Sequence, residues 1–488
     1  MKIKSNYSLS NCLNIFIVFS FLNCSSETIF KYKSHISINL SIKGSGTVKP
    51  ESGVYEINNR VVFEAKADSG YYFDRWEGFA EVIKKEKYEF VLTDDLNLTA
   101  IFSPIPELSS EIKIYNPKKI DPNPIFIVEN GGNKAYLTDK TGEKLKIWNF
   151  DSKLGNDLEL MLDGSLIGLF KSDNVFFSFG GYGGIIKKFY PSGILEWQYE
   201  VNNENELAHH DFEILPNGNI LLLVWERFTE EEAINFGFSG IGEIFLEKII
   251  EINPNNDTIV WEWRSVDHLI QDFDSIKPNY GNISEYPAKI NLNYNQIENG
   301  DLMHANGICY DRKRNLIFLS VNFYSEVWAI PHQYDTEATK TEKGDLAFRF
   351  GNPNAFDSSD ERIFFNNHHP NIVSLHPETL DNFLIYMNGS KNNQSIVYEF
   401  TFPSQFESDP RNWKKPELFW KFSDVHLFSA KISGCIRLPN GNTLICEGDY
   451  GYWEVTTDKE VVWNSKTKDL IISTLNIFSN SFSKKMVK

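Results

Sequence analysis

The sequence contains few cysteines, no excess of basic residues and, beyond its first segment, no long apolar run. Lysine and arginine together number 48, against 66 aspartate and glutamate residues, and the formal net charge is −18. This balance argues against a nucleic-acid binder, which needs a basic face. It is compatible with anionic small molecules, because a local group of cations or hydrogen-bond donors outweighs a distant acidic surface. With 14% aromatic residues, the chain has the apolar side chains needed for folded cores.

Five cysteines occur, and their spacing fits no zinc-binding pattern. Two of them, Cys12 and Cys24, belong to the N-terminal segment. The other three, Cys309, Cys435 and Cys446, each lie in an apolar run typical of a strand. We therefore predict buried thiols in preference to disulfides or nucleophiles. A bridge between Cys435 and Cys446 across a hairpin is the alternative.

Residues 1–24 have the pattern of an export signal. Lys2 and Lys4 form a short basic start, and residues 13–22 form an apolar core too short to span a bilayer. The stretch Phe21-Leu22-Asn23-Cys24-Ser25-Ser26 resembles a bacterial lipobox, in which the cysteine becomes the lipidated first residue. We predict export to the periplasm, or anchoring to the outer membrane or cell surface, with membrane contact only through a lipid on Cys24. An ordinary cleaved signal peptide is the alternative.

Residues 36–103 are predicted to form a small all-β domain. The run 36–42 alternates apolar and polar residues with period two, as in a half-buried strand, and further strands are predicted at 61–65 and 96–102. The phrase Gly70-Tyr71-Tyr72-Phe73-Asp74-Arg75-Trp76-Glu77-Gly78 and the closing Ala100-Ile101-Phe102 are similar to those of the divergent internalin-type B repeat. That resemblance implies a spacer or adhesive module without catalytic chemistry.

From about residue 110 a turn-and-strand pattern repeats. The phrase Leu-Pro-Asn-Gly-Asn, followed by a short apolar run, occurs at 215–219 and 438–442, and a weaker form occurs at 162–165. Asn and Gly tolerate the positive φ of tight turns, so each phrase predicts a turn that leads into a strand. Six apolar segments with an aromatic residue close the units, at 145–148, 194–197, 259–263, 346–350, 418–420 and 461–463.

Four short strands in each of six units predict an all-β fold. We predict a six-bladed β-propeller over residues 110–470, followed by a C-terminal tail at 471–488. A pair of β-sandwiches is the structural alternative, but it would not explain six aromatic-ended units. A short capped helix is predicted within an insertion at 228–233.

Ten histidines occur, and three of them precede the first strand of neighbouring units: His210, His304 and His368. In a propeller the first strand of each blade lines the central channel, so these imidazoles are predicted to converge. Such a group suits a metal ion or an oxyanion. No carboxylate is expected at an equivalent place in the other units, and we predict no metal site. Turn histidines that hydrogen-bond the backbone are the alternative, and His268, in an insertion, is a candidate for indirect support.

Several longer phrases resemble the bacterial arylsulfate sulfotransferase family over residues 125–465. They include the phrase at 210–219, Asp267-His268-Leu269-Ile270-Gln271-Asp272, Met303-His304-Ala305-Asn306 and Phe350-Gly351-Asn352-Pro353. The resemblance implies a six-bladed propeller that transfers a sulfo group from an aryl sulfate to a phenol, without a nucleotide sulfate donor or another cofactor. The sequence agrees, because it contains no Gly-rich phosphate loop. The expected partners are a small aryl sulfate and a phenol, with no nucleic acid.

The resemblance also implies roles for the three histidines. His368 is the implied nucleophile, since Phe365-Asn366-Asn367-His368 aligns with the family's aromatic-x-Gln-His, and it would hold the sulfo group as a sulfo-histidine. His210 and His304 would donate hydrogen bonds to the sulfuryl oxygens and to the phenol oxygen, where charge develops.

Three further residues, His209, His369 and Asn322, complete the predicted site as substrate-binding residues. His369 is a rival for the nucleophile, but consecutive strand residues face opposite ways, so only one of the histidine pair is expected in the channel. The family usually has an arginine on the strand after the second histidine, where this chain has Asn322. Losing a charged contact in the transition state typically costs several kcal/mol. A non-catalytic binding propeller held at the cell surface is therefore the alternative function.

Overall fold

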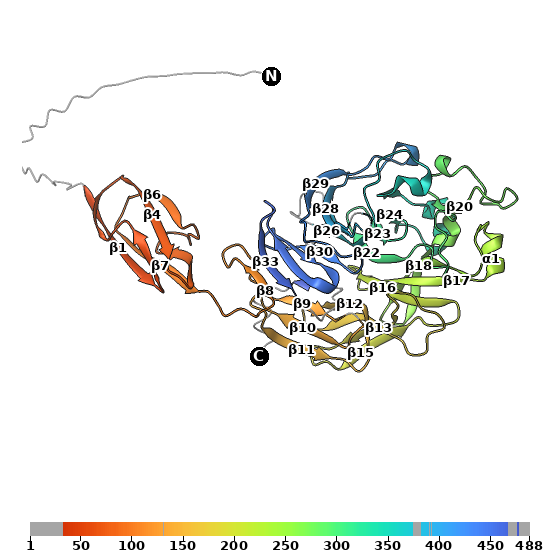
Figure 1. The fold of residues 1–488 in the computed structure, drawn as a ribbon, viewed down its shortest axis with the longest axis horizontal. Helices are drawn as coiled ribbons and strands as arrows, with labels where there is room; N and C mark the ends of the chain where they lie inside the picture. Colours follow the sequence, from red (N-terminus) through yellow and green to blue (C-terminus); the bar gives the residue numbers. More distant parts are fainter. Residues whose placement is uncertain are drawn as a thin grey trace, which may run out of the picture. The chain divides into compact units, whose positions relative to one another are not determined.

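The computed structural model describes residues 33–129, 131–373, 382–389, 391, 393–466 and 476–477. The predicted export signal with Cys24, and most of the predicted C-terminal tail, lie outside these residues. The chain divides into two compact units, Met1–Ile105 and Pro106–Lys488 (Figure 1). In the described part of the chain, no helix combines the length and the apolar composition needed to cross a bilayer.

The N-terminal unit consists of two small β-sheets. Its strands are β1 (His35–Lys43), β2 (Gly46–Lys49), β3 (Gly53–Glu56), β4 (Arg60–Ala67), β5 (Tyr71–Glu77), β6 (Lys87–Val91) and β7 (Leu96–Pro104). One sheet has the order β3-β1-β7-β5 and the other the order β2-β4-β6. The predicted alternation is present in β1, where Ile36 and Ile38 are buried between exposed neighbours. Phe73, Trp76 and Phe102 from the family-like phrases are buried in the core.

The C-terminal unit contains, among the described residues, six sheets of four or five antiparallel strands. The first sheet contains β9 (Ile125–Val128), β10 (Lys134–Thr138) and β11 (Lys144–Asn149). The second sheet contains β12 (Leu154–Leu160), β13 (Leu166–Lys171), β14 (Gly184–Phe189) and β15 (Leu195–Glu200). The third sheet contains β16 (Glu206–Ile214), β17 (Ile220–Phe228), β18 (Ile244–Asn253) and β19 (Thr258–Arg264). The fourth sheet contains β22 (Ala305–Asp311), β23 (Leu316–Val321), β24 (Glu326–Pro331) and β25 (Phe348–Phe350). The fifth sheet contains β26 (Asn367–Val373), β27 (Asn382–Met387), β28 (Ile396–Thr401) and β29 (Glu417–Phe422). The sixth sheet contains β30 (Gly434–Arg437), β31 (Thr443–Cys446), β32 (Gly451–Val455) and β33 (Val461–Lys466).

The turn phrases found in the sequence join the first strand of a sheet to the second. Gly218, with φ of 86°, lies in the turn between β16 and β17, and Gly441, with φ of 89°, lies in the turn between β30 and β31. Glycine takes this left-handed conformation without steric cost, which explains the repeated phrase. The six aromatic-ended segments overlap the last strands of the six sheets, β11, β15, β19, β25, β29 and β33. These local predictions are confirmed.

The two ends of the C-terminal unit add strands to each other's sheets. Strand β8 (Ile112–Tyr115) pairs with β33 in the sixth sheet, and β34 (Asn476–Ile477) pairs with β9 in the first. The sequence assigned residues 476–477 to a tail, because nothing nearby in the chain marks them as a strand. Their partner lies at the opposite end of the unit, and pairing with it satisfies an otherwise open sheet edge.

Insertions carry the short helices of the C-terminal unit. The helix predicted near 228–233 is α1 (Glu230–Asn235), and Thr229 and Glu232 form its capping box, as predicted. The remaining short elements are η1 (Ser265–His268), β20 (Leu269–Ile270), η2 (Ile283–Glu285), β21 (Ile290–Asn291), α2 (Thr336–Thr339), η3 (Glu342–Gly344), η4 (Pro353–Phe356), η5 (Pro410–Asn412) and η6 (Gly448–Tyr450).

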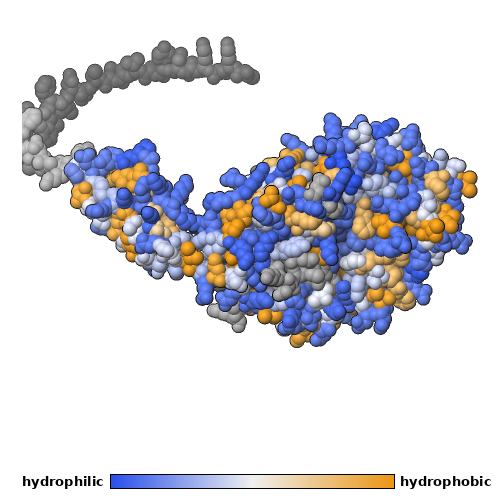
Figure 2. All heavy atoms as spheres, in the orientation of Figure 1, coloured by the Kyte–Doolittle hydropathy of each residue, from blue (hydrophilic) through white to orange (hydrophobic). Residues whose placement is uncertain are grey.

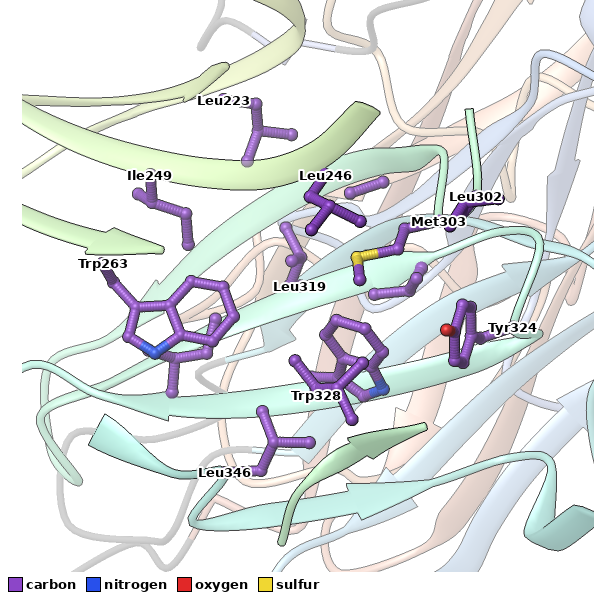
Figure 3. Close-up of a cluster of buried hydrophobic side chains, with 14 of the residues drawn as sticks. Leu223, Leu246, Ile249, Trp263, Leu302, Met303, Leu319, Tyr324, Trp328 and Leu346 are labelled. Carbon is purple, nitrogen blue, oxygen red and sulfur yellow. The ribbon is translucent and has the colours of Figure 1, made fainter. Parts of the chain in front are cut away.

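A large hydrophobic cluster packs the third sheet against the fourth (Figure 3). Leu246 and Trp263 contribute from the third sheet, and Leu319 and Trp328 from the fourth. The indole N–H groups are satisfied, since Trp263 donates to the carbonyl of Gly344 at 2.8 Å and Trp328 donates to Glu326 at 2.9 Å. Burying each such large side chain stabilises the fold by roughly 1.5–3 kcal/mol. The cluster therefore holds two neighbouring sheets in a fixed arrangement.

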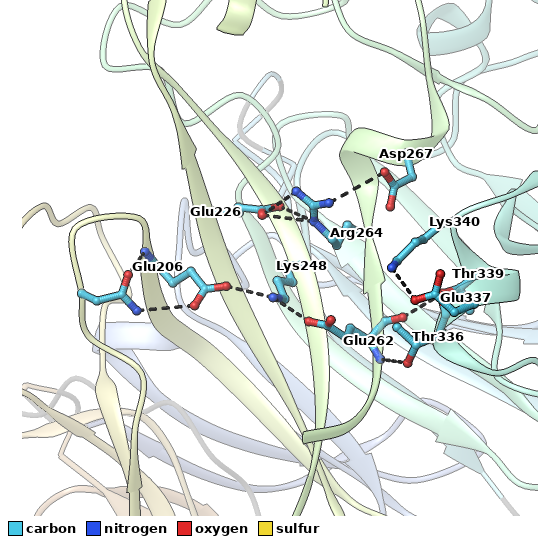
Figure 4. A network of polar contacts seen from close by, with 11 residues as sticks. Glu206, Glu226, Lys248, Glu262, Arg264, Asp267, Thr336, Glu337, Thr339 and Lys340 are labelled. Atoms are coloured by element: carbon cyan, nitrogen blue, oxygen red, sulfur yellow. Dashed lines mark hydrogen bonds and ion pairs between the residues drawn. The ribbon is translucent and has the colours of Figure 1, made fainter. Parts of the chain in front are cut away.

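Ion pairs tie the strands of the third sheet together along one face (Figure 4). Lys248 on β18 contacts Glu206 on β16 at 2.8 Å and Glu262 on β19 at 2.7 Å. Arg264 on β19 contacts Glu226 on β17 at 2.7 Å. Because Lys248 is mostly buried, these contacts are less screened than surface pairs, and they fix the start of β16.

The three described cysteines are buried thiols outside any disulfide, as predicted. Cys446 lies opposite Gly434 and Cys435 lies opposite Ile445, so the two side chains leave opposite faces of the hairpin and do not form a bridge. The buried thiols are thus structural parts of the sheets.

On the face drawn in Figure 2, hydrophilic residues predominate and hydrophobic residues lie between them in small groups.

Candidate active site

The first strands of neighbouring sheets contact one another in the order β9, β12, β16, β22, β26 and β30. In four of these strands the pairing register with the second strand shifts, which marks a β-bulge. The shifts lie between Leu154 and Leu158, Ala208 and Phe212, Ala305 and Gly307, and His368 and Asn371. A bulge interrupts the regular alternation of side chains and re-aims those within it.

The bulged segments line a cavity of about 360 Å³, called here the histidine cavity. Four histidines line it: His210, His304, His368 and His369. Three of them have a left-handed backbone, with φ of 52° at His210, 51° at His304 and 56° at His369. Non-glycine residues rarely adopt this conformation, and such strain is concentrated at functional sites. The structure thus brings together the three histidines for which convergence was predicted.

The orientation of His368 is fixed by Asn388, which follows β27. The amide nitrogen of Asn388 donates to the carbonyl of Ser429 at 2.9 Å, so its Oδ1 is left to accept. That oxygen lies 2.5 Å from Nδ1 of His368, which must therefore carry the proton. Burial lowers the pKa of His368 to about 4. The ring is a neutral imidazole whose Nε2 carries a lone pair, as a nucleophile requires.

The backbone before His368 is held by three side chains. The carbonyl oxygen of Asn367 accepts hydrogen bonds from Asn306 at 2.9 Å, from Ser320 at 3.1 Å and from Asn322 at 3.1 Å. Oδ1 of Asn322 also accepts from Asn366 at 2.9 Å. Asn322 is buried and is not among the residues that line the histidine cavity. Asn322 therefore holds the backbone next to His368 through hydrogen bonds, whereas the sequence predicted that it would bind the substrate.

His304 lies directly before β22 and is backed by a carboxylate. Its Nδ1 lies 2.5 Å from Oδ2 of Asp301, whose side chain is 1% exposed. Phe323 stacks on the imidazole at 4.5 Å between ring centroids. A carboxylate behind Nδ1 holds the ring in the Nδ1–H tautomer. His304 and His368 therefore have different partners, a carboxylate and a neutral amide.

His210 lines the cavity, whereas His209 lies behind it. Nδ1 of His209 is 2.9 Å from Nδ1 of His210, and the His209 ring stacks on Trp225 at 3.9 Å between centroids. His209 is fully buried and is not among the lining residues, so the structure gives it no direct access to a substrate. Burial, followed by the neighbouring histidines, lowers the pKa of His210 well below its ordinary value. A Cβ at Gly181 would lie 2.0 Å from Nε2 of His210, so only glycine allows this approach.

His369 corrects the expectation that only one of two consecutive histidines faces the cavity. Both His368 and His369 line it, because the bulge between His368 and Asn371 removes the strict alternation. Nδ1 of His369 lies 3.2 Å from the carbonyl of Cys435 and 2.7 Å from Nδ2 of Asn371. Burial lowers its pKa to about 4. The contact with Cys435 on β30 ties His369 to the sixth sheet, whereas Asn371 lies on the same strand as His369.

The sequence interpretation missed two aspartates in the cavity wall. Asp157 and Asp211 line the histidine cavity, and a hydrogen bond joins their carboxyl groups. Asp157 precedes Gly164 by seven residues (164 − 157), as Asp211 precedes Gly218 by seven (218 − 211), so repeat alignment would have found it. Asp157 is therefore equivalent to Asp211, whereas the place equivalent to His210 in that unit is occupied by Asn156, so the expectation of no carboxylate in register with the histidines is not contradicted. Burial and then Asp157 raise the pKa of Asp211 well above its ordinary value.

A second cavity of about 250 Å³, called the acidic cavity, adjoins the first through shared residues. Glu159 and Glu213 line it together with the two aspartates. Burial, followed by Asp157, raises the pKa of Glu213 to about 8. Within the described residues, no group of three or more histidine, cysteine or acidic side chains is arranged to hold a metal ion.

Two lysines, also missed, supply positive charge to the histidine cavity: Lys171 at the end of β13 and Lys431 before β30. Burial, then Lys153, lowers the pKa of Lys171, whose Nζ lies 4.2 Å from the ring centroid of Tyr182. His268, by contrast, stacks on Trp263 and lies 2.7 Å from Asp345. Neither His268 nor these two partners line the histidine cavity, so its predicted indirect support of the site stays a prediction.

Comparison with known families identifies both units. A family model described as Arylsulfotransferase (ASST) matches residues 110–476, and one described as Divergent InlB B-repeat domain matches residues 36–106. Among curated proteins, none matches the chain. A solved structure of a Bacteroides caccae protein of unknown function is 12% identical over 74% of this chain and 100% of that chain, with a TM-score of 0.44. The Dos1 propeller is 10% identical over 89% of this chain and 85% of that chain, with a TM-score of 0.33.

Proposed function

The chain belongs to the arylsulfotransferase family, and we propose that it moves a sulfo group from an aryl sulfate to a phenol through a sulfo-histidine on His368. The observation that carries this proposal is the pair His368 and Asn388. The amide oxygen accepts a hydrogen bond from Nδ1–H, burial keeps the ring neutral, and the imidazole lines a cavity. A neutral imidazole held in one tautomer is what attack on sulfur requires.

The reaction has two half-reactions. In the first, Nε2 of His368 attacks sulfur, the bond from sulfur to the aryl oxygen breaks, and a phenolate leaves. In the second, the oxygen of an acceptor phenol attacks the same sulfur, and the bond from Nε2 to sulfur breaks. One protein nitrogen thus replaces a direct collision of donor and acceptor with two intramolecular steps.

Charge on the transferring group is offset by the cavity wall. His210 and His304 line the cavity, and in this proposal they donate hydrogen bonds to the sulfuryl oxygens and to the phenol oxygen. Lys171 and Lys431 bring the positive charge that the family usually supplies by an arginine at the position of Asn322. Their presence favours an active transferase over the alternative of a binding propeller that has lost catalysis.

For the architecture, we infer that the six sheets form a six-bladed β-propeller around the histidine cavity. The contacts between successive first strands, and the exchange of β8 and β34 between the end sheets, support this arrangement (Figure 1). We also propose export of the protein and a lipid anchor at Cys24, with the B-repeat unit as a spacer. The lipobox-like Phe21-Leu22-Asn23-Cys24 supports the anchor.

Intact mass measurement tests the enzyme proposal directly. The purified protein is mixed with 4-nitrophenyl sulfate and no acceptor, and a gain of one acid-labile sulfo group is expected. His368→Ala should abolish the gain, whereas His369→Ala, the matched change one residue away, should retain it. A folded protein that acquires no sulfo group from several aryl sulfates would contradict the proposal and favour the binding propeller.

A further inference from the structure

The two half-reactions require a place for one proton, and this inference therefore rests on the proposed function. A phenolate of high basicity leaves readily only if it is protonated, and the acceptor phenol must later lose its proton. The protein thus gives one proton to the leaving phenolate when the sulfo group reaches His368, and it takes one from the acceptor phenol when the sulfo group leaves. His210 is neutral, so it can deliver a proton at Nε2 only if another reaches it at Nδ1.

A buried chain of groups leads away from Nδ1 of His210. Nδ1 of His209 lies at 2.9 Å, and Nε2 of His209 lies 3.0 Å from Oε2 of Glu247 on β18. His209 and Glu247 have side chains that are 0% exposed. Within the described residues, neither Nε2 of His209 nor Oε2 of Glu247 has a hydrogen-bonding partner with good geometry. Two orphaned polar atoms 3.0 Å apart need only a small rotation to satisfy each other.

The other contacts of the chain hold it in place. Oε1 of Glu247 accepts from the backbone N–H of Ala305 at 2.7 Å, next to His304. The ring of His209 lies flat on Trp225, with an interplanar angle of 8°. At the cavity end, no described residue hydrogen-bonds Nε2 of His210, and the ring lines the histidine cavity. The chain therefore has one fixed buried end and one end open to a substrate.

We propose that Glu247, His209 and His210 form a proton relay that lends a proton to the leaving phenolate and recovers it from the acceptor phenol. In the loaded state Glu247 is a carboxylic acid that donates to Nε2 of His209. Nδ1–H of His209 donates to Nδ1 of His210, and Nε2–H of His210 points into the cavity. Glu247 and His209 act through His210 and are positioning residues, whereas His210 touches the phenol oxygen.

The transfer balances in atoms and charge. The phenolate takes the Nε2 proton of His210, His210 takes the Nδ1 proton of His209, and His209 takes the carboxyl proton of Glu247. The unloaded state has a Glu247 carboxylate that accepts from Nε2–H of His209, and His210 with a bare Nε2. The acceptor phenol then gives its proton to that nitrogen, and the three steps run in reverse. Both states keep the same heavy-atom contacts, so little rearrangement is needed.

The electrostatic surroundings agree with the loaded state. Burial, and then Asp301, raise the pKa of Glu247 well above its ordinary value, which keeps the carboxyl protonated. Burial lowers the pKa of His209, which keeps the imidazole neutral, against an opposing effect of Asp301. The charged and titratable groups that act on this chain from neighbouring elements are Asp301, His304 and His368.

Glu247→Gln tests the relay, because the amide can still accept from Ala305 and donate to His209 but cannot release a proton. Sulfonation of the protein is followed in single turnovers with a series of aryl sulfates. With 4-nitrophenyl sulfate, whose phenolate is weakly basic, the variant should match the wild type within about twofold. With phenyl sulfate it should be slowed at least about a hundredfold, the usual contribution of general acid catalysis. Equal slowing of all donors, or no slowing, would overturn the relay.

Asp301→Asn serves as the comparison, since Asp301 and His304 are the rival acid–base pair. If Asp301→Asn slows sulfonation by phenyl sulfate more than sulfonation by 4-nitrophenyl sulfate, and Glu247→Gln does not, the relay is wrong. The wild type supplies a second measurement that needs no variant: infrared difference spectra should lose a buried carboxylic-acid band when the sulfo-enzyme forms from phenyl sulfate. A spectrum without that loss would also overturn the relay. If the wild type is never sulfonated, the proposed function itself is wrong. If the wild type is sulfonated normally but Glu247→Gln affects all aryl sulfates equally, only the relay is wrong.

Discussion

Asn388→Asp would change the charge behind the proposed nucleophile while keeping the size of the side chain. In the structure, Oδ1 of Asn388 lies 2.5 Å from Nδ1 of His368, and Nδ2 donates to the carbonyl of Ser429 at 2.9 Å. Aspartate keeps the first contact in charged form and loses the second. A carboxylate at this distance stabilises the imidazolium and should raise the pKa of His368 by about 1–3 units.

The size of the effect follows from the pKa of His368, which burial lowers to about 4. A rise of about two units would bring that pKa to about 6. At about pH 5.5 the neutral fraction of the imidazole would then fall from nearly all to about one quarter. Because only the neutral ring attacks sulfur, the sulfonation rate should fall about fourfold at that pH. At about pH 8 the ring is neutral in both proteins, so the two rates should differ little.

The assay is release of 4-nitrophenolate in a single turnover without acceptor, measured from about pH 4 to pH 8. The acid limb of the rate should move from near pH 4 to near pH 6 in Asn388→Asp. Asn464→Asp is the matched control, because Asn464 is a buried asparagine whose Nδ2 donates to the carbonyl of Tyr452 at 2.9 Å in the sixth sheet. An acid limb that stays near pH 4 in Asn388→Asp would refute the role given to the neutral amide.

Two further predictions concern charge. Lys431→Ala should reduce kcat/KM for aryl sulfates by about tenfold or more, because an exposed cation of the histidine cavity is lost, and Lys431→Arg should retain most of it; equal rates for the two variants would contradict this role. Burial raises the pKa of Glu213 to about 8, so the folded state binds a proton that the unfolded state releases above about pH 4.5. The contribution of Glu213 to the free energy of unfolding is therefore largest at low pH. It is lost as the pH rises to about 8, by at most about 1.4 kcal/mol per pH unit. Glu213→Gln should remove this loss in denaturant unfolding followed against pH, and an unchanged pH slope would show that the carboxyl is not protonated in the folded protein.

The local structure of this protein could be predicted because its causes lie close together in the sequence. The turns at Gly218 and Gly441 depend on a positive φ that glycine adopts easily. The capped start of α1 depends on Thr229 and Glu232, three residues apart. The aromatic segments 145–148 and 461–463 form last strands because a strand's pattern is visible in a few residues.

Part of the candidate site was also visible in the sequence, because the units repeat. His210 and His368 lie within the first strands β16 and β26 of their units, His304 lies directly before β22, and all three line one cavity. The same logic would have found Asp157, seven residues before Gly164, but a search confined to histidines passed over it. His369 was assigned to the wrong face, since strand periodicity does not show where a bulge adds a residue.

The sequence by itself therefore determined the turns, the last strands of the sheets and the three histidines that share a cavity. Only the tertiary structure decided what stands behind each histidine: Asn388 behind His368, Asp301 behind His304, and His209 behind His210. It also moved Asn322 from the cavity into the support of the His368 strand. The physical reason is range. Turn geometry and periodicity act between near neighbours in the chain, whereas tautomer, charge and access to the cavity depend on bulges and on contacts between sheets.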